Sequence, residues 1–235
     1  MSVFIPLIIL FLVMFTQVFL QVSPATFSIF YHYAIGKKSA KSASDLSLYY
    51  ILGSECFSVL FFIIIYMIVS AIFCNLPESA VDIFAFIMSG IAAALSILSF
   101  FCYYKKGKTA ALFLPRPTAD QLVTCAKSVK KKSDAFLLGA FSNTLELPFT
   151  FSLYVIFALA STVMESPLLP RCILVIAYVI VIILPLFIMR AAFRSGRNLA
   201  DITRFRIKKK PLFRILISVD FLLTAIATLI LGVIK

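Results

Sequence analysis

Six long apolar stretches determine what this chain can fold into. They run from about Val3 to Ile35, Leu46 to Cys74, Ala80 to Tyr104, Asp134 to Val163, Arg171 to Met189 and Pro211 to Ile234. A helix of about 20 apolar residues crosses the hydrocarbon core of a bilayer. With 62% hydrophobic residues overall, the composition excludes an ordinary soluble domain. The sequence therefore predicts an all-α membrane protein with six transmembrane helices.

Positive charge gathers in the segments that follow the first, third and fifth stretches. Two of these segments are long basic linkers, Lys105–Ser133 and Arg190–Lys210, whereas the turns after the second and fourth stretches carry Glu78 and Glu165. Cytoplasmic loops are enriched in Lys and Arg, so we expect a multi-pass protein of the cell (plasma) membrane with both termini outside. This pattern explains the net charge of +12 without a nucleic-acid partner.

The second half of the first basic linker has helical spacing. From Thr118 to Lys132, apolar residues recur at helical intervals with lysines beside them. The pattern is typical of a helix that lies on an anionic membrane surface, and a solvated basic linker explains it equally well. In the first case, the contacts to the anionic inner leaflet come from Lys127, Lys130, Lys131 and Lys132.

A short motif occurs twice, once in the first stretch and once in the fourth. Pro24, Thr26, Phe27 and Ser28 recur as Pro148, Thr150, Phe151 and Ser152. Proline removes a helical hydrogen bond, so we expect the first and fourth helices to be broken or kinked at Pro24 and Pro148. The charge pattern gives these two helices opposite orientations, which predicts inverted repeats of the kind found in secondary transporters. The alternative is a chance match in a chain rich in Phe and Ser.

The repeat interpretation divides the chain into three parts. Residues 1–104 form the first three-helix repeat, residues 105–133 the basic cytoplasmic linker, and residues 134–235 the second three-helix repeat.

Three carboxylates fall inside the apolar stretches. They are Glu55, Glu146 and Asp220. A charge at the centre of a membrane helix costs about 2.5–3.5 kcal/mol on insertion scales, so each is a functional candidate. Glu146 is the strongest because Asn143, Glu146 and Thr150 are spaced three and four apart and share a helical face. We expect Glu55 to pair across to the first or fourth span, or to lie near the surface.

The predicted substrate site lies where the two proline-containing segments meet. Its residues are Glu146, Asn143, Thr144, Thr150, Pro148, Pro24, Thr26, Gln21, Glu55 and Asp220. Thr144 is included because a proline four residues later leaves its carbonyl without a helical donor. The alternative for each carboxylate is a structural hydrogen bond between helices.

Enzymatic and metal-binding motifs are missing from the sequence. The five cysteines form no CxxC pair and there is one histidine, so a zinc site of the usual spacing is not indicated. The sequence has no nucleophile–base motif, phosphate loop or metalloprotease helix. It therefore predicts neither an enzyme nor a cofactor, and it leaves any metal unassigned.

The arrangement of six spans in two inverted halves, with a proline inside the first and fourth, resembles the lysine-exporter superfamily. That superfamily includes amino-acid exporters, metal-ion exporters and the thiol-disulfide membrane proteins of cytochrome c biogenesis. The stretch Asn143-Thr144-Leu145-Glu146-Leu147-Pro148 resembles an acid-plus-helix-break site. The cysteines that the thiol-transferring branch carries on the first and fourth spans are missing here. The resemblance implies export of a small solute or ion.

Three functions remain open from the sequence. The first is a secondary transporter that exports a small solute or cation and is coupled to protons or ions. The second is a membrane thiol-disulfide electron-transfer protein, which would need Cys56 or Cys172 to face the central cavity. The third is a non-transporting membrane scaffold. Whether the chain forms a homo-oligomer also stays open.

Overall fold

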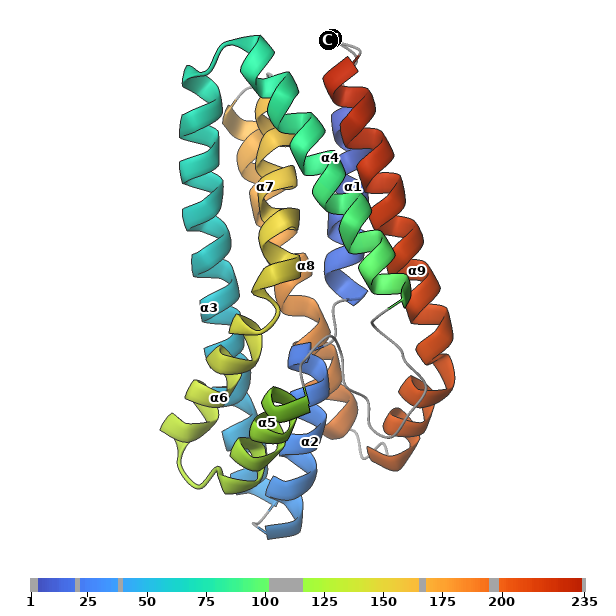
Figure 1. Cartoon of the computed structure of the whole chain (residues 1–235). Coiled ribbons are helices and arrows are strands. Elements are labelled where there is room, and N and C mark those ends of the chain that lie inside the picture. The colour runs from blue at the N-terminus through green and yellow to red at the C-terminus, as the bar shows by residue number, and fades with distance from the viewer. Residues whose placement is uncertain are drawn as a thin grey trace.

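The chain folds into α-helices that run along a common direction (Figure 1). The computed structural model describes residues 4–19, 22–37, 40–101, 116–164, 168–194 and 199–233. Within these ranges the elements are α1 (Phe4–Phe19), α2 (Val22–Lys37), α3 (Ala40–Asn75), α4 (Glu78–Phe101), α5 (Arg116–Ser128), α6 (Lys132–Thr144), α7 (Leu147–Val163), α8 (Leu168–Arg194) and α9 (Leu199–Val233). The predicted all-α class is confirmed for this part of the chain.

Helix length and composition confirm a multi-pass membrane protein. Five helical segments are long and apolar enough to cross a membrane, namely Phe4–His32, Ala43–Phe73, Ser79–Phe101, Leu169–Arg194 and Pro211–Val233. A sixth span results if α6 and α7, which meet at a bend of 68°, are counted as one broken helix. Large apolar side chains cover the outer surface; Phe4, for example, is 70% exposed. Such a surface suits lipid rather than water.

The α3–α4 turn and helix α5 mark opposite ends of the bundle (Figure 1). The turn from α3 to α4 and the C-terminal end of α9 lie at one end, and α5 lies at the other, beside α2. The exposed side chains of Lys127, Lys130 and Lys131, which belong to α5 or follow it directly, are at the second end. The basic character of this end matches the charge pattern that the sequence showed.

Helix α5 occupies part of the predicted basic linker, of which residues 102–115 lie outside the described residues. Its bounds overlap the helix expected from Thr118 to Lys132. Leu122 and Ala126 are buried, and α5 packs against α2. Its apolar face is therefore covered by the chain itself and is not free to enter a membrane surface. A contact with anionic lipid would depend on the lysines alone.

Small polar side chains join α4 to α9. Ser89 Oγ donates a hydrogen bond to the Ala225 carbonyl (2.7 Å), and Ser96 Oγ donates to the Ser218 carbonyl (2.6 Å). Small residues let membrane helices approach closely enough for such bonds. These hydrogen bonds hold α4 and α9 together along their length.

The orientation in the membrane can be tested by labelling. In a cysteine-free background, we expect Ser128→Cys to resist a membrane-impermeant maleimide in intact cells and to react after permeabilisation. Ser79→Cys should react in intact cells, because Ser79 is exposed at the opposite end of the bundle. The physical reason is the retention of basic segments on the cytoplasmic side. Reaction of Ser128→Cys from outside, with Ser79→Cys protected, would reverse the topology.

Candidate functional site

The break between α6 and α7 is the most irregular part of the described membrane region. Helix α6 ends at Thr144 and α7 begins at Leu147. The turn between them is closed by the Glu146 amide, which donates to the Asn143 carbonyl (2.9 Å). Pro148 lies in the first turn of α7, where a missing N–H costs no helical hydrogen bond. The predicted break near Pro148 is confirmed, and this proline begins a new helix instead of interrupting a continuous one.

The first proline-containing segment also begins a helix. Helix α1 ends at Phe19, and α2 begins at Val22 with Pro24 as its third residue. Residues 20 and 21 lie between the two helices and outside the described residues, so the predicted site residue Gln21 does too. Pro24 is buried and lines a pocket together with Glu146. The two proline-containing segments therefore approach each other inside the bundle.

This pocket contains about 300 Å³ of space free of protein atoms, including its opening. The helices α1, α2, α3 and α8 and the break between α6 and α7 surround it. The lining residues are Gln17, Pro24, Ser54, Glu55, Ser58, Asn143, Glu146, Ile182, Pro185 and Leu186. The part of the pocket that the centre of a water molecule can reach is about 20 Å³, which is room for about one or two water molecules.

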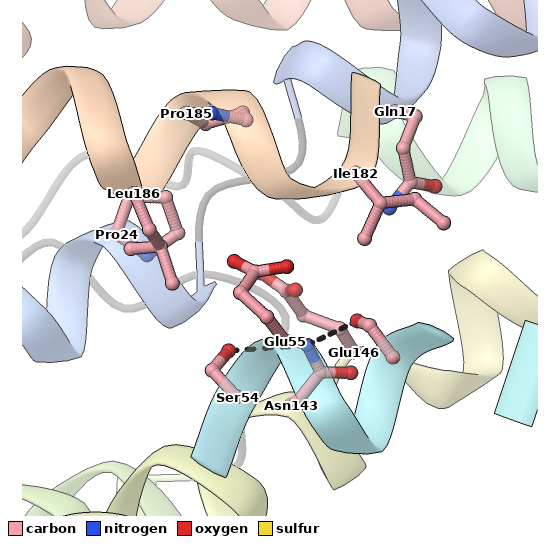
Figure 2. A pocket seen from close by; sticks show the side chains of 10 residues that line it. Gln17, Pro24, Ser54, Glu55, Asn143, Glu146, Ile182, Pro185 and Leu186 are labelled. Atoms are coloured by element: carbon pink, nitrogen blue, oxygen red, sulfur yellow. Dashed lines mark hydrogen bonds between the residues drawn. The ribbon is translucent and has the colours of Figure 1, made fainter. Parts of the chain in front are cut away.

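Two carboxylates from different helices meet in the pocket (Figure 2). Glu55 on α3 is 8% exposed, and Glu146 at the break is 5% exposed. Figure 2 shows their carboxyl groups next to each other, pointing toward α8. Glu55 Oε2 has no hydrogen-bond partner among the described residues. Two buried carboxylates side by side are costly to ionise together, so this arrangement favours a proton or a positive charge beside them.

Asn143 joins α6 to α3 on the floor of the pocket. Its Nδ2 donates to Ser58 Oγ (2.6 Å) and to Ser54 Oγ (3.3 Å), as the dashed lines in Figure 2 show. With Nδ2 used in this way, the buried Oδ1 has no partner among the described residues. The Asn143 amide therefore holds the hydroxyls of Ser54 and Ser58 beside the two carboxylates. Its own Oδ1 is a further hydrogen-bond acceptor on this side of the pocket.

Two glycines allow α3 and α6 to approach closely enough for these contacts. A methyl carbon added at Gly139 would overlap the Tyr50 carbonyl oxygen and lie 2.8 Å from the Ser54 amide nitrogen. A methyl carbon added at Gly53 would overlap the Phe136 carbonyl group in the same way. The close backbone contact of α3 and α6 at Gly53 and Gly139 thus brings Glu55 and Asn143 into one pocket.

Several predicted site residues do not line the pocket. Thr144 and Pro148 are exposed, and the Thr144 hydroxyl donates back to the Ala140 carbonyl (3.0 Å). Thr150 is buried and donates to the Glu146 carbonyl (3.2 Å), so it supports the start of α7 without facing the ligand space. Thr26 is buried near Tyr50. Of these residues, only Thr150 was assigned from a helical face shared with Asn143 and Glu146, and the 68° bend between α6 and α7 interrupts that face.

Asp220 lies apart from the pocket, between α9 and α1. It is 4% exposed, and its Oδ2 is hydrogen-bonded to Thr16 Oγ1. The same hydroxyl also has the Leu12 carbonyl as an acceptor at 3.1 Å. One hydroxyl hydrogen cannot serve both acceptors fully. This geometry fits the interhelical hydrogen bond that was the alternative to a substrate contact for Asp220.

Aromatic side chains enclose the pocket from both sides along the bundle. On one side Tyr178 packs against Phe62 (4.6 Å between ring centroids) and Phe157 (4.5 Å). On the other side Phe193 packs against Tyr31 (4.7 Å) and Phe27 (5.7 Å). We call these sets, completed by Tyr154 and by Tyr50 respectively, the α7-side and α2-side aromatic layers.

Their order along the helices places the pocket between them. On α8, Tyr178 precedes and Phe193 follows the pocket residue Pro185, each by about two helical turns. The two layers were not predicted from the sequence, because no spacing rule distinguishes their rings among 25 Phe and 9 Tyr.

Metal and thiol chemistry find little support in the described residues. Among them, no group of three or more His, Cys, Asp or Glu side chains is placed to hold a metal ion. Cys56, Cys125 and Cys172 are exposed and unpaired, and none of the three lines the pocket. A thiol-disulfide exchange at this pocket would need a cysteine that faces it.

The chain was compared with protein-family models, with curated proteins and with solved structures, and none of them matches. The resemblance to the lysine-exporter superfamily therefore rests on the arrangement of spans and prolines.

Proposed function

We propose that the chain is a secondary transporter that moves a small solute or cation through the pocket at the helix break, coupled to protons or ions. The observation that carries the proposal is the meeting of Glu55 and Glu146, both more than nine-tenths buried, at an interrupted membrane helix. Ionisable groups at membrane depth mark substrate and proton pathways. Transporter sites lie near the bilayer midplane at discontinuous helices.

The direction of the helices supports an inverted-repeat interpretation. In Figure 1, the segment formed by α1 and α2 runs from the end that holds the α3–α4 turn to the end that holds α5, and α6 with α7 runs the opposite way. The helices that follow each segment, α3 and α8, are also opposed. In this interpretation the first half comprises α1–α4 and the second α6–α9, with the site between their broken first spans.

The aromatic layers supply the barriers that alternating access requires. A ligand in the pocket is separated from each end of the bundle by packed rings, so one layer must open while the other stays closed. Pro185 lies inside α8 between Tyr178 and Phe193, and a helix bends most easily at proline. Bending there would move Phe193 away from Phe27 and Tyr31 and open the pocket toward the basic end.

A flux measurement tests this function. Purified protein in liposomes is screened with radiolabelled amines, amino acids and monovalent and divalent cations, with and without an imposed pH gradient. We expect saturable flux of at least one cargo, lowered about tenfold or more by Glu55→Gln, because a charged hydrogen bond contributes about 1.5–3 kcal/mol. Asp120→Asn, which removes a carboxylate from α5 outside the pocket, is the control and should transport like wild type.

Two outcomes would contradict the proposal. The first is flux that is equal for wild type, Glu55→Gln and protein-free liposomes for every cargo. The second is flux that is lost equally in the Asp120→Asn control. The first outcome would favour the scaffold alternative, and the second a general loss of folded protein.

A further inference from the structure

The pocket in this conformation is too small for an organic cargo. The centre of a water molecule can reach about 20 Å³ of it, which is room for about one or two water molecules. The α7-side and α2-side aromatic layers lie on either side of it along the bundle. In this closed conformation the pocket can therefore bind water, a proton or a small ion.

Two oxygen atoms that face this space have no donor in the described part of the chain. They are Glu55 Oε2 and Asn143 Oδ1, and both are buried. Both residues line the pocket, and they are 8% and 4% exposed. A buried acceptor without a donor is costly, and a space of this size beside two polar groups suits an ordered water molecule.

A water molecule between these two oxygens completes the hydrogen bonding of Glu55 in either protonation state. When Glu55 is ionised, the water donates one hydrogen to Oε2 and the other to Asn143 Oδ1. When Glu55 is protonated, its hydroxyl donates to the water, which still donates to Asn143 Oδ1. Asn143 keeps its bonds to Ser54 and Ser58 in both states. A proton can therefore be bound and released without a rearrangement of the surrounding side chains.

The titratable groups around Glu55 favour its protonated form. The carboxyl group of Glu146 lies next to it (Figure 2), and two buried ionised carboxylates side by side are costly. Tyr50 on α3 and Tyr154 on α7 interact electrostatically with both acids, and a tyrosine is uncharged near neutral pH. The lining residues of α1, α2, α6 and α8 carry no titratable group. Among the described lining residues, Glu146 is thus the titratable group that faces Glu55.

A metal ion fits these surroundings less well than a proton. The lining residues of α2 and α8 supply hydrocarbon, whereas calcium and magnesium require six or more oxygen ligands around them. In transporters, backbone carbonyls at a helix break coordinate sodium. Here the Asn143 carbonyl already accepts from the Glu146 amide, and the Glu146 carbonyl accepts from the Phe149 amide. A proton needs only one oxygen.

From these observations we infer that Glu55 is the proton-binding residue of the pocket, and that a water molecule held between Glu55 Oε2 and Asn143 Oδ1 takes the proton to and from it. In the closed conformation Glu55 is protonated. On release, the O–H bond of its carboxyl group breaks, the proton passes to the water and on to solvent, and a carboxylate remains. This inference rests on the proposed transport function and names the proton as its coupling ion.

The test is infrared spectroscopy of the purified full-length protein in a detergent that has no carbonyl group. A protonated carboxyl group has a C=O stretching band that an ionised carboxylate lacks. We expect wild type to show such a band at neutral pH, Glu55→Gln to lose it, and Glu146→Gln to keep it. Asp220→Asn identifies any band from the acid between α9 and α1. The Asp120→Asn control should match wild type.

Two further measurements test the water molecule. Transfer of wild type to heavy water should shift the Glu55 band to lower frequency, because the water exchanges the hydrogen of the carboxyl group. Asn143→Leu keeps the size of the side chain and removes Oδ1, so the water loses its second partner. The Glu55 band of this variant should move to a different frequency, in protein that still elutes as a single species in size-exclusion chromatography.

The coupling ion is tested in liposomes that contain the protein. Flux of the cargo found by the screen should be driven by an imposed pH gradient and not by an imposed sodium gradient. Loss of the pH effect in Glu55→Gln, with the effect kept in Asp120→Asn, would support the assignment to Glu55.

The possible failures can be told apart. If wild type and Glu55→Gln have the same carboxyl band, or heavy water leaves that band unshifted, the inferred proton site is wrong. If a sodium gradient drives Glu55-dependent flux and a pH gradient does not, transport stands with a different coupling ion. If no cargo shows Glu55-dependent flux, the proposed transport function fails, whereas a Glu55 band that responds to heavy water would still establish the proton site.

Discussion

Replacement of Gly139 by alanine should cost most of the folded protein. The added methyl carbon would overlap the Tyr50 carbonyl oxygen, which belongs to the backbone of α3 and cannot rotate away. To make room, α3 and α6 must separate, and Asn143 would then lose its bonds to Ser54 and Ser58. Overpacking typically costs about 1–3 kcal/mol and occasionally more. An overlap of backbone with backbone should lie at the upper end of that range.

The measurement is the yield of monodisperse protein in size-exclusion chromatography, followed by thermal unfolding of what is recovered. Gly53→Ala should behave like Gly139→Ala, because its methyl carbon would overlap the Phe136 carbonyl group. Gly90→Ala is the matched control: nothing lies within 4 Å of its added carbon, and alanine favours a helix by up to about 1 kcal/mol over glycine. Equal stability of Gly139→Ala and Gly90→Ala would disprove the close contact of α3 and α6.

The large-scale fold could be predicted from the sequence because the hydrocarbon core of a membrane allows few backbone structures. An apolar run of 20 or more residues must satisfy its backbone internally, which in a single segment means a helix. Charge in the short loops then marks the ends. For this reason the sequence predicts the positions of the long helices and the break near Pro148. It does not predict that α9 continues as one helix through Pro211.

The pocket was predictable only in part. Pro24 could be assigned to it from the repeated motif, Glu146 as a carboxylate inside an apolar stretch beside the expected helix break, and Glu55 was expected to pair across to the first or fourth span. Glu55 meets Glu146 because α3 packs closely against α6. Two glycines, Gly53 and Gly139, allow this close packing, and the hydrophobic periodicity of the sequence does not predict it. Thr150 was expected on the face of Asn143 and Glu146 because the spacing rule assumes one unbroken helix, while a turn separates α6 from α7.

Glu146→Gln should abolish transport while the protein still folds. Glutamine keeps the size of the side chain and its hydrogen-bonding capacity, but it cannot hold a negative charge or release a proton. Glu146 lies beside Glu55 in the pocket (Figure 2), so it is one of the two carboxylates that can bind a cation or a proton there. Loss of a charged hydrogen bond of about 1.5–3 kcal/mol corresponds to a loss of flux of about tenfold or more.

Folding should not suffer from this change, because an ionised group at membrane depth itself costs about 2.5–3.5 kcal/mol on insertion scales. We therefore expect the expression of Glu146→Gln to equal or exceed that of wild type. Liposome flux is compared at two pH values for wild type, Glu146→Gln, Glu55→Gln and the Asp120→Asn control. The wild-type rate should change with pH, and the residual rate of Glu146→Gln should change less, because a proton and the cargo can no longer compete at that carboxylate and only Glu55 remains. If Glu146→Gln transports like wild type with the same pH dependence, Glu146 is a structural hydrogen-bonding group of the helix break, and transport does not depend on its charge.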